Sequence, residues 1–366
     1  MKRFLCLLII LASSQVVIGR ILMKPYLQAV TSNSIYIIVE CTTPDTVTVN
    51  FGLTQSYGHA ARTEIIATTT ASPVTYVHKV KLTGLTADTK YFYEAIQGNS
   101  TFRSFSFHTA PNPGKSFRFT WMADCRTGKS VHDRISQLML EANPLFSLYG
   151  GDLCASSSYP AWKNEFFRTK ELDLISVVPF FNTTGNHEGI GQNTYAFMQN
   201  PSSASNTQDY YSFDYGDIHF LCINTELSCS EDSPQYKFAE QDLASSKQPW
   251  KIVYSHIPGY GSGGHGEDKE LINMIKKIFE PHHVDLLISG HSHYYQHNLV
   301  NGIHHLIIGS AGAPLYTPLN ATYTVKSLKD YNFAVFNVTT DSLTINVYND
   351  KNVKLDSLKL TKNMGK

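Results

Sequence analysis

The sequence has little charge and no excess of either sign. Only 16% of its 366 residues are charged, and 30 Lys and Arg balance 30 Asp and Glu. A neutral chain lacks the electrostatic attraction that a nucleic-acid coat or an anionic-membrane binder needs. The hydrophobic share of 42% is too high for a disordered chain. Length and composition together predict about two folded domains.

Several patterns are missing as well. The sequence has no Walker phosphate-binding loop and no Gly-x-Ser-x-Gly nucleophile elbow. It has no internal repeat, and no stretch beyond the N-terminus is long and apolar enough to cross a bilayer. These absences exclude a P-loop NTPase, a serine hydrolase of that type and a solenoid.

The N-terminus has the pattern of a secretory signal peptide. Lys2 and Arg3 precede the apolar run 4–12, and small residues follow up to Gly19. The apolar run is short for a membrane span. We therefore expect residues 1–19 to be removed. The mature protein is then exported to a periplasmic, extracellular or lumenal space, with no membrane span.

Residues 20–112 are typical of an all-β domain. Short runs rich in β-branched and aromatic residues alternate with turn residues, which predicts a β-sandwich. The expected strands cover residues 34–41, 45–51, 76–82, 90–96 and 101–107. A segment rich in breakers, 108–114, links this domain to the next.

Residues 113–366 alternate apolar strands with amphipathic stretches, which predicts a layered α/β domain. Strands are expected at 117–123, 144–149, 177–181, 218–223, 251–254, 284–289 and 302–308, and antiparallel strands at 333–338 and 342–348. Helices are expected at 130–141, about 159–172 and 271–279.

Polar residues of ligand type follow five of these strands. Ligand sites in layered α/β folds lie at the carboxyl ends of strands. The residues are Asp124, Asp152, Asn186 with His187 and Glu188, His256, and His291 with His293. Carboxylate, amide and imidazole donors suit zinc, manganese or iron. Two carboxylates (Asp124 and Asp152), the amide of Asn186 and three imidazoles (His256, His291 and His293) are too many for one four-coordinate ion. They fit two ions that share a bridging carboxylate.

In this order the motifs resemble those of the calcineurin-like metallophosphoesterases. They are Asp124, Gly-Asp (151–152), Gly-Asn-His-Glu (185–188), His256-x-Pro258 and Gly-His-Ser-His (290–293). The segments 24–28, 78–80, 82–85 and 89–93 resemble the fibronectin-III-like N-terminal domain of purple acid phosphatases. The resemblance implies an N-terminal β-sandwich followed by a β-sandwich with flanking helices.

The resemblance also implies roles for these residues. Asp124 and His293 would bind a first metal, Asp152 would bridge, and Asn186, His256 and His291 would bind a second. His187 would face the substrate, oriented by Glu188, and His265 in the Gly-rich loop would be a second substrate-facing histidine. Arg126, beside Asp124, could be a solvated charge, part of an internal ion pair or a phosphate contact, since a guanidinium matches the geometry of phosphate.

Three positions depart from the family pattern. Ala155 stands where purple acid phosphatases have the tyrosine that ligates ferric iron. Arg126 stands where many other metallophosphoesterases have a histidine, and His297 stands where the final motif usually has an arginine. The first metal thus lacks one expected protein ligand.

The cysteines leave several arrangements open. Cys6 lies in the signal, and five others remain. Cys222 and Cys229 could close a small loop. Cys125 and Cys154 follow two presumed metal-bearing aspartates. They could form a disulfide, offer a thiolate ligand or be two inert thiols, and we favour the disulfide.

The expected protein is a secreted, dinuclear-metal hydrolase of small phosphate esters, most simply an acid-type phosphomonoesterase. A phosphodiesterase with the same site is the nearest alternative. A protein that binds phosphoesters without hydrolysing them is the alternative from another class.

Overall fold

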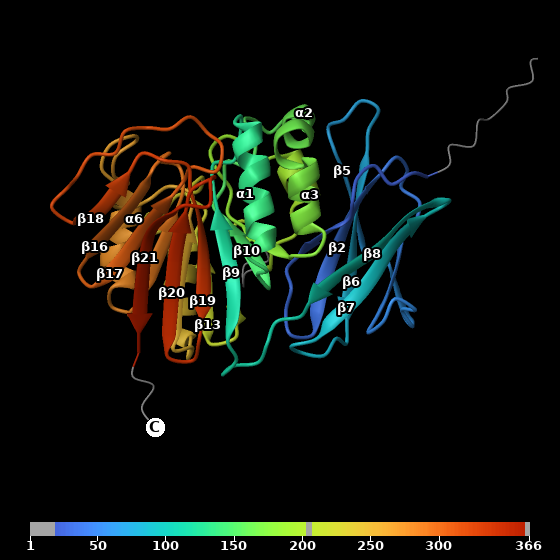
Figure 1. The fold of residues 1–366 in the computed structure, drawn as a ribbon, viewed down its shortest axis with the longest axis horizontal. Coiled ribbons are helices and arrows are strands. Elements are labelled where there is room, and N and C mark those ends of the chain that lie inside the picture. The colour runs from blue at the N-terminus through green and yellow to red at the C-terminus, as the bar shows by residue number, and fades with distance from the viewer. Residues whose placement is uncertain (1–18, 203–206, 363–366) are drawn as a thin grey trace, which may run out of the picture.

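The computed structural model describes residues 19–202 and 207–362. The predicted signal peptide lies outside the described residues, apart from Gly19. Three sheets make up the fold, and Figure 1 shows the N-terminal strands on one side of the molecule and the remaining strands on the other.

The N-terminal part is all β. All five predicted strands are present, and three short ones, β1, β4 and β5, are added to them. Both β4 and β5 are largely exposed, so their sequences carry little of the alternation that marks a half-buried strand. The strands are β1 (Tyr26–Gln28), β2 (Ser34–Cys41), β3 (Thr48–Gly52), β4 (His59–Arg62), β5 (Ile65–Thr68), β6 (Tyr76–Thr83), β7 (Lys90–Gln97) and β8 (Ser100–His108).

The second part alternates strands and helices, as predicted. Its strands are β9 (Phe117–Met122), β10 (Phe146–Tyr149), β11 (Phe180–Asn182), β12 (Tyr211–Tyr215), β13 (Ile218–Cys222), β14 (Trp250–Ser255), β15 (Leu286–Ser289), β16 (Tyr295–Val300), β17 (Ile303–Ile308), β18 (Thr324–Leu328), β19 (Phe333–Val338), β20 (Ser342–Tyr348) and β21 (Lys354–Thr361).

The helices are short and cover the outer faces. They are α1 (Lys129–Glu141), α2 (Tyr159–Ala161), α3 (Thr169–Ile175), α4 (Gln192–Phe197), α5 (Pro234–Ser245) and α6 (Lys269–Met274), with π-helical turns η1 (Trp162–Phe166) and η2 (Ile275–Phe279). Figure 1 shows α1 and α3 side by side over the middle of the large sheet. The single helix predicted near 159–172 is therefore wrong in detail: α2, η1 and α3 share that stretch and the residues just after it.

One sheet runs through both parts of the chain. Its ten strands follow the order β21-β20-β19-β9-β10-β11-β1-β2-β6-β5. The join is the parallel pairing of β1 with β11, where Gln28 is opposite Phe180. The smaller sheets have the orders β12-β13-β14-β15-β17-β16-β18 and β4-β3-β7-β8. The division of the chain at residue 112 stays a prediction.

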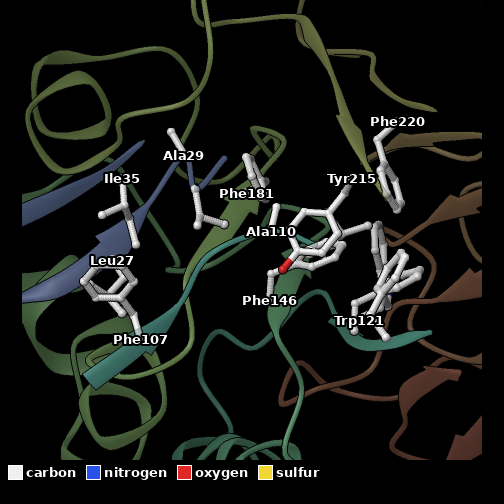
Figure 2. Close-up of a cluster of buried hydrophobic side chains, with 14 of the residues drawn as sticks. Leu27, Ala29, Ile35, Phe107, Ala110, Trp121, Phe146, Phe181, Tyr215 and Phe220 are labelled. Atoms are coloured by element: carbon white, nitrogen blue, oxygen red, sulfur yellow. The ribbon is translucent and has the colours of Figure 1, made fainter. Parts of the chain in front are cut away.

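A continuous apolar core joins the two parts. Figure 2 shows Leu27, Ile35 and Phe107 at one end of the cluster and Trp121 and Phe220 at the other. Between the two large sheets the contacts are mainly aromatic, and they fix the sheets face to face. The ring of Phe119 in β9, which stacks on Phe336 of the same sheet, meets the ring edge of Phe220 in β13 of the other sheet.

This packing brings the ends of parallel strands to one edge. In the ten-stranded sheet β9, β10 and β11 are parallel neighbours, and in the seven-stranded sheet β14 and β15 are parallel neighbours. The five predicted ligand motifs follow these five strands, so they meet where the two sheets share an edge.

The favoured disulfide between Cys125 and Cys154 is wrong. Both thiols are buried and free, as are the other three cysteines among the described residues. The Cys125 thiol points to the Leu153 carbonyl and the Cys154 thiol to that of Ser156. Burial raises the pKa of both, which keeps them protonated and unreactive.

The described helices are all too short or too polar to serve as a membrane span.

Candidate metal centre

Three of the predicted ligands lie in strained backbone. Asp124, Asp152 and His291 have φ angles of 56°, 53° and 65°, in the left-handed region that non-glycine residues rarely occupy. Each stands just past the end of a buried strand, where the chain turns sharply out of the sheet. Such strain is typical of functional sites, where the surrounding fold over-determines the geometry.

Two glycines permit the close approach of the ligand loops. A Cβ on Gly185 would lie 2.1 Å from the backbone nitrogen of Asp152, and one on Gly290 would lie 2.5 Å from Oδ2 of Asp124. No larger residue fits at either position. The requirement for glycine before Asn186 and before His291 is therefore steric.

Three side chains with metal-ligating atoms gather around His256, which is fully buried. Its Nδ1 lies 2.7 Å from the carbonyl of Gly150 and so carries the proton, which turns Nε2 toward the site. That nitrogen lies 3.0 Å from Oδ1 of Asn186, 3.2 Å from Nδ1 of His291 and 3.4 Å from Oδ1 of Asp152. One ring nitrogen has no hydrogen-bonding pattern that satisfies three such neighbours.

These spacings fit an ion. Donors about 2.1 Å from a common ion lie roughly 3.0–3.4 Å from one another in octahedral or tetrahedral geometry. A buried group formed by Asp124, Asp152 and His256 also offers donor atoms that all lie within 4.8 Å of one another. Among the described residues, the buried Oδ1 of Asp124 has no hydrogen-bond partner. The residues present therefore fit a metal at this edge of the sheets.

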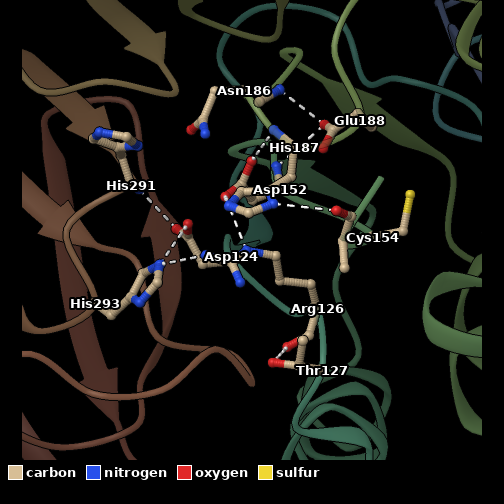
Figure 3. A network of polar contacts seen from close by, with 12 residues as sticks. Asp124, Arg126, Thr127, Asp152, Cys154, Asn186, His187, Glu188, His291 and His293 are labelled. Carbon is tan, nitrogen blue, oxygen red and sulfur yellow. Dashed lines mark hydrogen bonds and ion pairs between the residues drawn. The ribbon is translucent and has the colours of Figure 1, made fainter. Parts of the chain in front are cut away.

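Asp124 and His293 make up the other side of the cluster (Figure 3). Oδ2 of Asp124 accepts a hydrogen bond from the backbone of His291 at 2.8 Å, and its Oδ1 lies 3.4 Å from Nε2 of His293. Nδ1 of His293 donates to the carbonyl of Pro314 at 2.8 Å, and its ring stacks on Tyr316 at 4.2 Å. Sequence reasoning missed Tyr316, whose only signal was its place in the loop after β17.

Glu188 fastens two of the ligand loops to each other. Its carboxylate accepts hydrogen bonds from the backbone nitrogens of Gly185, Asp152 and Leu153 at 2.8, 3.1 and 3.2 Å. Burial and the nearby Asp152 raise the pKa of Glu188 to about 8. The residue thus positions Asp152 and the Asn186 loop. The resemblance implied a different task, the orientation of His187, whose Nδ1 instead lies 3.2 Å from the carbonyl of Ala155.

Burial and the neighbouring His256 and His265 lower the pKa of His291 to about 3. Burial also opposes the charged form of His256, but the carboxylates of Asp152, Asp124 and Glu188 raise its pKa overall. Burial likewise disfavours the charged form of Asp152, but His256, His187 and Arg126 lower its pKa and keep it ionised. The ionised Asp152 and the neutral His291 have the protonation states that metal ligands need, whereas the raised pKa of His256 means that this ring would release a proton when it binds an ion.

The two predicted substrate-facing histidines lie beside the cluster. The backbone nitrogen of His187 donates to Oδ1 of Asp152 at 3.0 Å, its Nδ1 lies 3.2 Å from the carbonyl of Ala155, and its Nε2 lies 3.8 Å from Oδ2 of Asp152. The ring of His265 lies 4.1 Å from the ring of His291. Burial and the nearby His293 lower the pKa of His265.

Neither tyrosine near the Gly-Asp motif faces the cluster. The Tyr149 hydroxyl bonds to Glu171, and the Tyr159 hydroxyl donates to Glu40 of the N-terminal part at 2.7 Å. His297 stands at the usual arginine position, and its Nε2 lies 2.8 Å from Nδ1 of His304. Figure 3 shows the Cys154 sulfur pointing away from Asp152, so Cys154 supplies no ligand.

Comparison with known proteins identifies the class. The calcineurin-like phosphoesterase family matches residues 117–295, the stretch from β9 to the start of β16 that carries all five ligand motifs. The chain therefore contains a calcineurin-like phosphoesterase domain.

Several similar proteins are purple acid phosphatases. A purple acid phosphatase of Glycine max is 27% identical over 286 residues, and the Fe(3+)-Zn(2+) purple acid phosphatase 12 of Arabidopsis thaliana is 28% identical over 274 residues. These alignments cover 69% and 66% of this chain and only 61% and 58% of the relatives. The purple acid phosphatase PPD1 from yellow lupin shares the fold, with a TM-score of 0.78, 20% identity and coverage of 94% of this chain and 74% of that one.

Proposed function

We propose that the protein is a metal-dependent phosphoester hydrolase, most simply a phosphomonoesterase of the acid phosphatase type acting on small phosphorylated compounds. The observation that carries the proposal is the set of donors around Nε2 of His256. Asn186, His291 and Asp152 present a donor atom 3.0–3.4 Å from that nitrogen.

The metal would be zinc, manganese or iron, since all three accept carboxylate, amide and imidazole donors. Asp152, Asn186, His256 and His291 would hold it. An ion bound there would act as a Lewis acid on the phosphoryl oxygens and favour ionisation of an attacking water. The sequence predicts two such ions, and these donors meet the needs of one.

His187 has the geometry of a proton donor to the leaving group. Its Nδ1 hydrogen is engaged by the Ala155 carbonyl in either protonation state. Only Nε2, on the side of Asp152, is then free to exchange a proton. A side chain about one-third exposed lets a leaving alcohol reach it from solvent.

His265 and Arg126 would contact the phosphate. The His265 ring stands against His291 on a loop whose neighbours Gly264 and Gly266 have positive φ angles. Arg126 carries a fixed charge whatever the pH, because a guanidinium does not deprotonate in proteins. Both residues flank the place where a phosphate on the ion would lie.

Two further expectations extend the proposal. The N-terminal sequence pattern supports export to a periplasmic, extracellular or lumenal space. The motifs in residues 24–93 support a fibronectin-III-like domain. Its Glu40 accepts a hydrogen bond from the Tyr159 hydroxyl in α2 and pairs with the Lys163 ammonium in η1. That domain would brace the site rather than take part in it.

The decisive experiment is an assay of metal-loaded protein against a phosphomonoester and a phosphodiester. The full mature chain is stripped with a chelator, reloaded with Mn²⁺, Zn²⁺ or Fe²⁺, and assayed from pH 4 to 9. We expect metal-dependent release of phosphate from the monoester. Preference for the diester would assign the phosphodiesterase alternative. Tight metal binding with no hydrolysis of either would leave a phosphoester-binding protein.

A further inference from the structure

Arg126 lies inside the cluster rather than at its rim. It follows Asp124 by two residues on the loop after β9, and only 12% of its side chain is exposed. Figure 3 shows it extending toward Asp152. Its Nε donates to Oδ2 of Asp152 at 3.1 Å, and one terminal nitrogen, Nη2, lies 3.5 Å from Nε2 of His293.

These two contacts fall on atoms that a first ion would need. Oδ1 of Asp152 faces His256 and would bind the second ion. If Asp152 bridged two ions, its Oδ2 would have to bind the first. Here Oδ2 already accepts from Arg126. His293, whose Nδ1 proton goes to Pro314, has only Nε2 to offer, and that nitrogen faces the same guanidinium.

A guanidinium is a poor neighbour for a metal ion. It has five N–H donors and no lone pair, so it cannot act as a ligand. It also keeps its positive charge at every pH at which a protein is folded. A first divalent ion would have to displace Arg126 from Asp152 and then stand beside it, close to a second ion. Among the described residues, Asp124 and Asp152 are the carboxylates of the metal-binding group.

We propose that Arg126 takes the place of the first ion and that the centre holds a single divalent ion at the side of His256. This inference rests on the proposed function and deepens it. The ion is held by Asp152, Asn186 and His291 together with His256. The guanidinium supplies the second positive charge, and its remaining N–H groups are free for phosphate oxygens.

Asp124 and His293 have other tasks in this centre. Asp124 fixes the backbone of His291 through Oδ2, and its carboxylate adds negative charge beside the ion without being one of the four ligands. His293 is locked by Pro314 and by the stacked ring of Tyr316, so it forms a wall of the site. The centre is therefore asymmetric: His291 binds the ion and His293 does not.

The metal content of the purified chain tests the proposal. The full mature chain is stripped, loaded with excess Mn²⁺ and freed of unbound ions, and the metal is measured by elemental analysis. We expect one ion per chain and the isolated six-line electron paramagnetic resonance signal of a single Mn²⁺. Arg126→His removes the charge and adds a ring nitrogen, so it should bind two ions and give an exchange-coupled spectrum. Arg126→Lys keeps the charge and should bind one.

A pair of histidine variants tests the asymmetry without changing Arg126. His291→Ala should lose the ion, whereas His293→Ala, changed two residues away, should keep one per chain. Loss of the ion in both variants would overturn the proposal, as would one ion in a folded Arg126→His.

The outcomes separate this proposal from the one on which it rests. Two ions in the unaltered chain, with hydrolysis, would refute the single-ion centre and leave the phosphoester hydrolase standing. No bound ion together with no hydrolysis would refute the proposed function itself and the single-ion centre with it.

Discussion

Nε2 of His256 and Nδ1 of His291 lie 3.2 Å apart, although the two residues are 35 positions apart and follow different strands. The backbone fixes both rings. The carbonyl of Gly150 takes the other nitrogen of His256, and Asp124 holds the backbone nitrogen of His291. Two imidazole nitrogens held this close need a cation between them or a proton shared by them, and the adjoining Asn186 and Asp152 oxygens favour the cation.

Asp152→Ala should abolish hydrolysis and metal binding while the fold is retained. The substitution removes an oxygen 3.4 Å from Nε2 of His256 and the partner of Arg126. Elemental analysis should find no tightly bound ion, and phosphate release should fall to background. His59→Ala, an exposed histidine on β4, is the control for loss of a side chain. Wild-type turnover in a folded Asp152→Ala would refute the ligand assignment.

His187→Ala should lower turnover and spare the metal. The residue is proposed as a proton donor, and such groups contribute about 10²–10⁴-fold to rate. His187→Asn is the sharper variant, because its amide nitrogen can replace Nδ1 at the Ala155 carbonyl but cannot transfer a proton from the Nε2 position. Both variants should keep the wild-type metal content. Metal loss in His187→Asn would make His187 a ligand.

Glu188→Gln should weaken metal binding rather than the chemical step. The glutamine has one acceptor oxygen where the carboxylate serves three backbone N–H groups of the two ligand loops. Loss of such support to ligands typically costs 10–100-fold in affinity. Competition with a metal-sensitive dye should show this weakening, and saturating metal should restore most of the turnover. Unchanged affinity would show that the backbone holds the loops without Glu188.

Most of the strands and the ligand motifs could be predicted, because buried strands have a strong signature. The runs 34–41, 333–338 and 342–348 match β2, β19 and β20 residue for residue. The ligand residues could be found because each follows such a strand, and parallel strands end at one edge. The ligand residues can therefore be placed at one edge from the positions of the strands along the chain, without any knowledge of side-chain contacts.

The relations between side chains could not be predicted in the same way. An ion pair and a phosphate contact were both open for Arg126, but the sequence could not name Asp152 and His293 as its neighbours, because they depend on how the loop after β9 packs against the other ligand loops. Strand β1 was missed because three residues are too few for a pattern, although its pairing with β11 joins the two parts of the chain. Tyr316 was missed because an isolated aromatic residue in a loop gives no period to detect.

Stability should fall as pH rises through about 9 because of a histidine far from the metal centre. Burial opposes the charge on His219, but Asp214 and Asp242, each 2.7 Å from a ring nitrogen, raise its pKa to about 9. The charged His219 contributes its full stabilisation below pH 6.5, the ordinary pKa of a histidine, and loses it as the pH rises above about 9.

The exposed Asp214 limits the size of this contribution, which should be about 1–3 kcal/mol. Urea unfolding of the wild-type chain and of His219→Gln between pH 6 and 10 measures it. The two curves should converge at high pH. A constant gap across the range would show that His219 stabilises the fold by packing, not by charge.

The iron-loaded protein should lack the intense visible band of the purple enzymes. That band is tyrosinate-to-ferric charge transfer, and Ala155 supplies no phenolate at the tyrosine position. The two nearby candidates are engaged elsewhere, Tyr149 with Glu171 and Tyr159 with Glu40. Burial and the charge of Glu40 also raise the pKa of Tyr159, which opposes its ionisation.

A visible spectrum of the protein loaded with iron under air checks this prediction. We expect a nearly colourless solution, and activity with Mn²⁺ or Zn²⁺ comparable to that with iron, because no anionic oxygen from a tyrosine favours the ferric state. A strong band would mean that another phenolate reaches the ion. Tyr316, stacked on His293, is then the first residue to change. Loss of the band in Tyr316→Phe, with Tyr159→Phe unaffected, would identify Tyr316 as the ligand and contradict its assigned role as the ring that holds His293 in place.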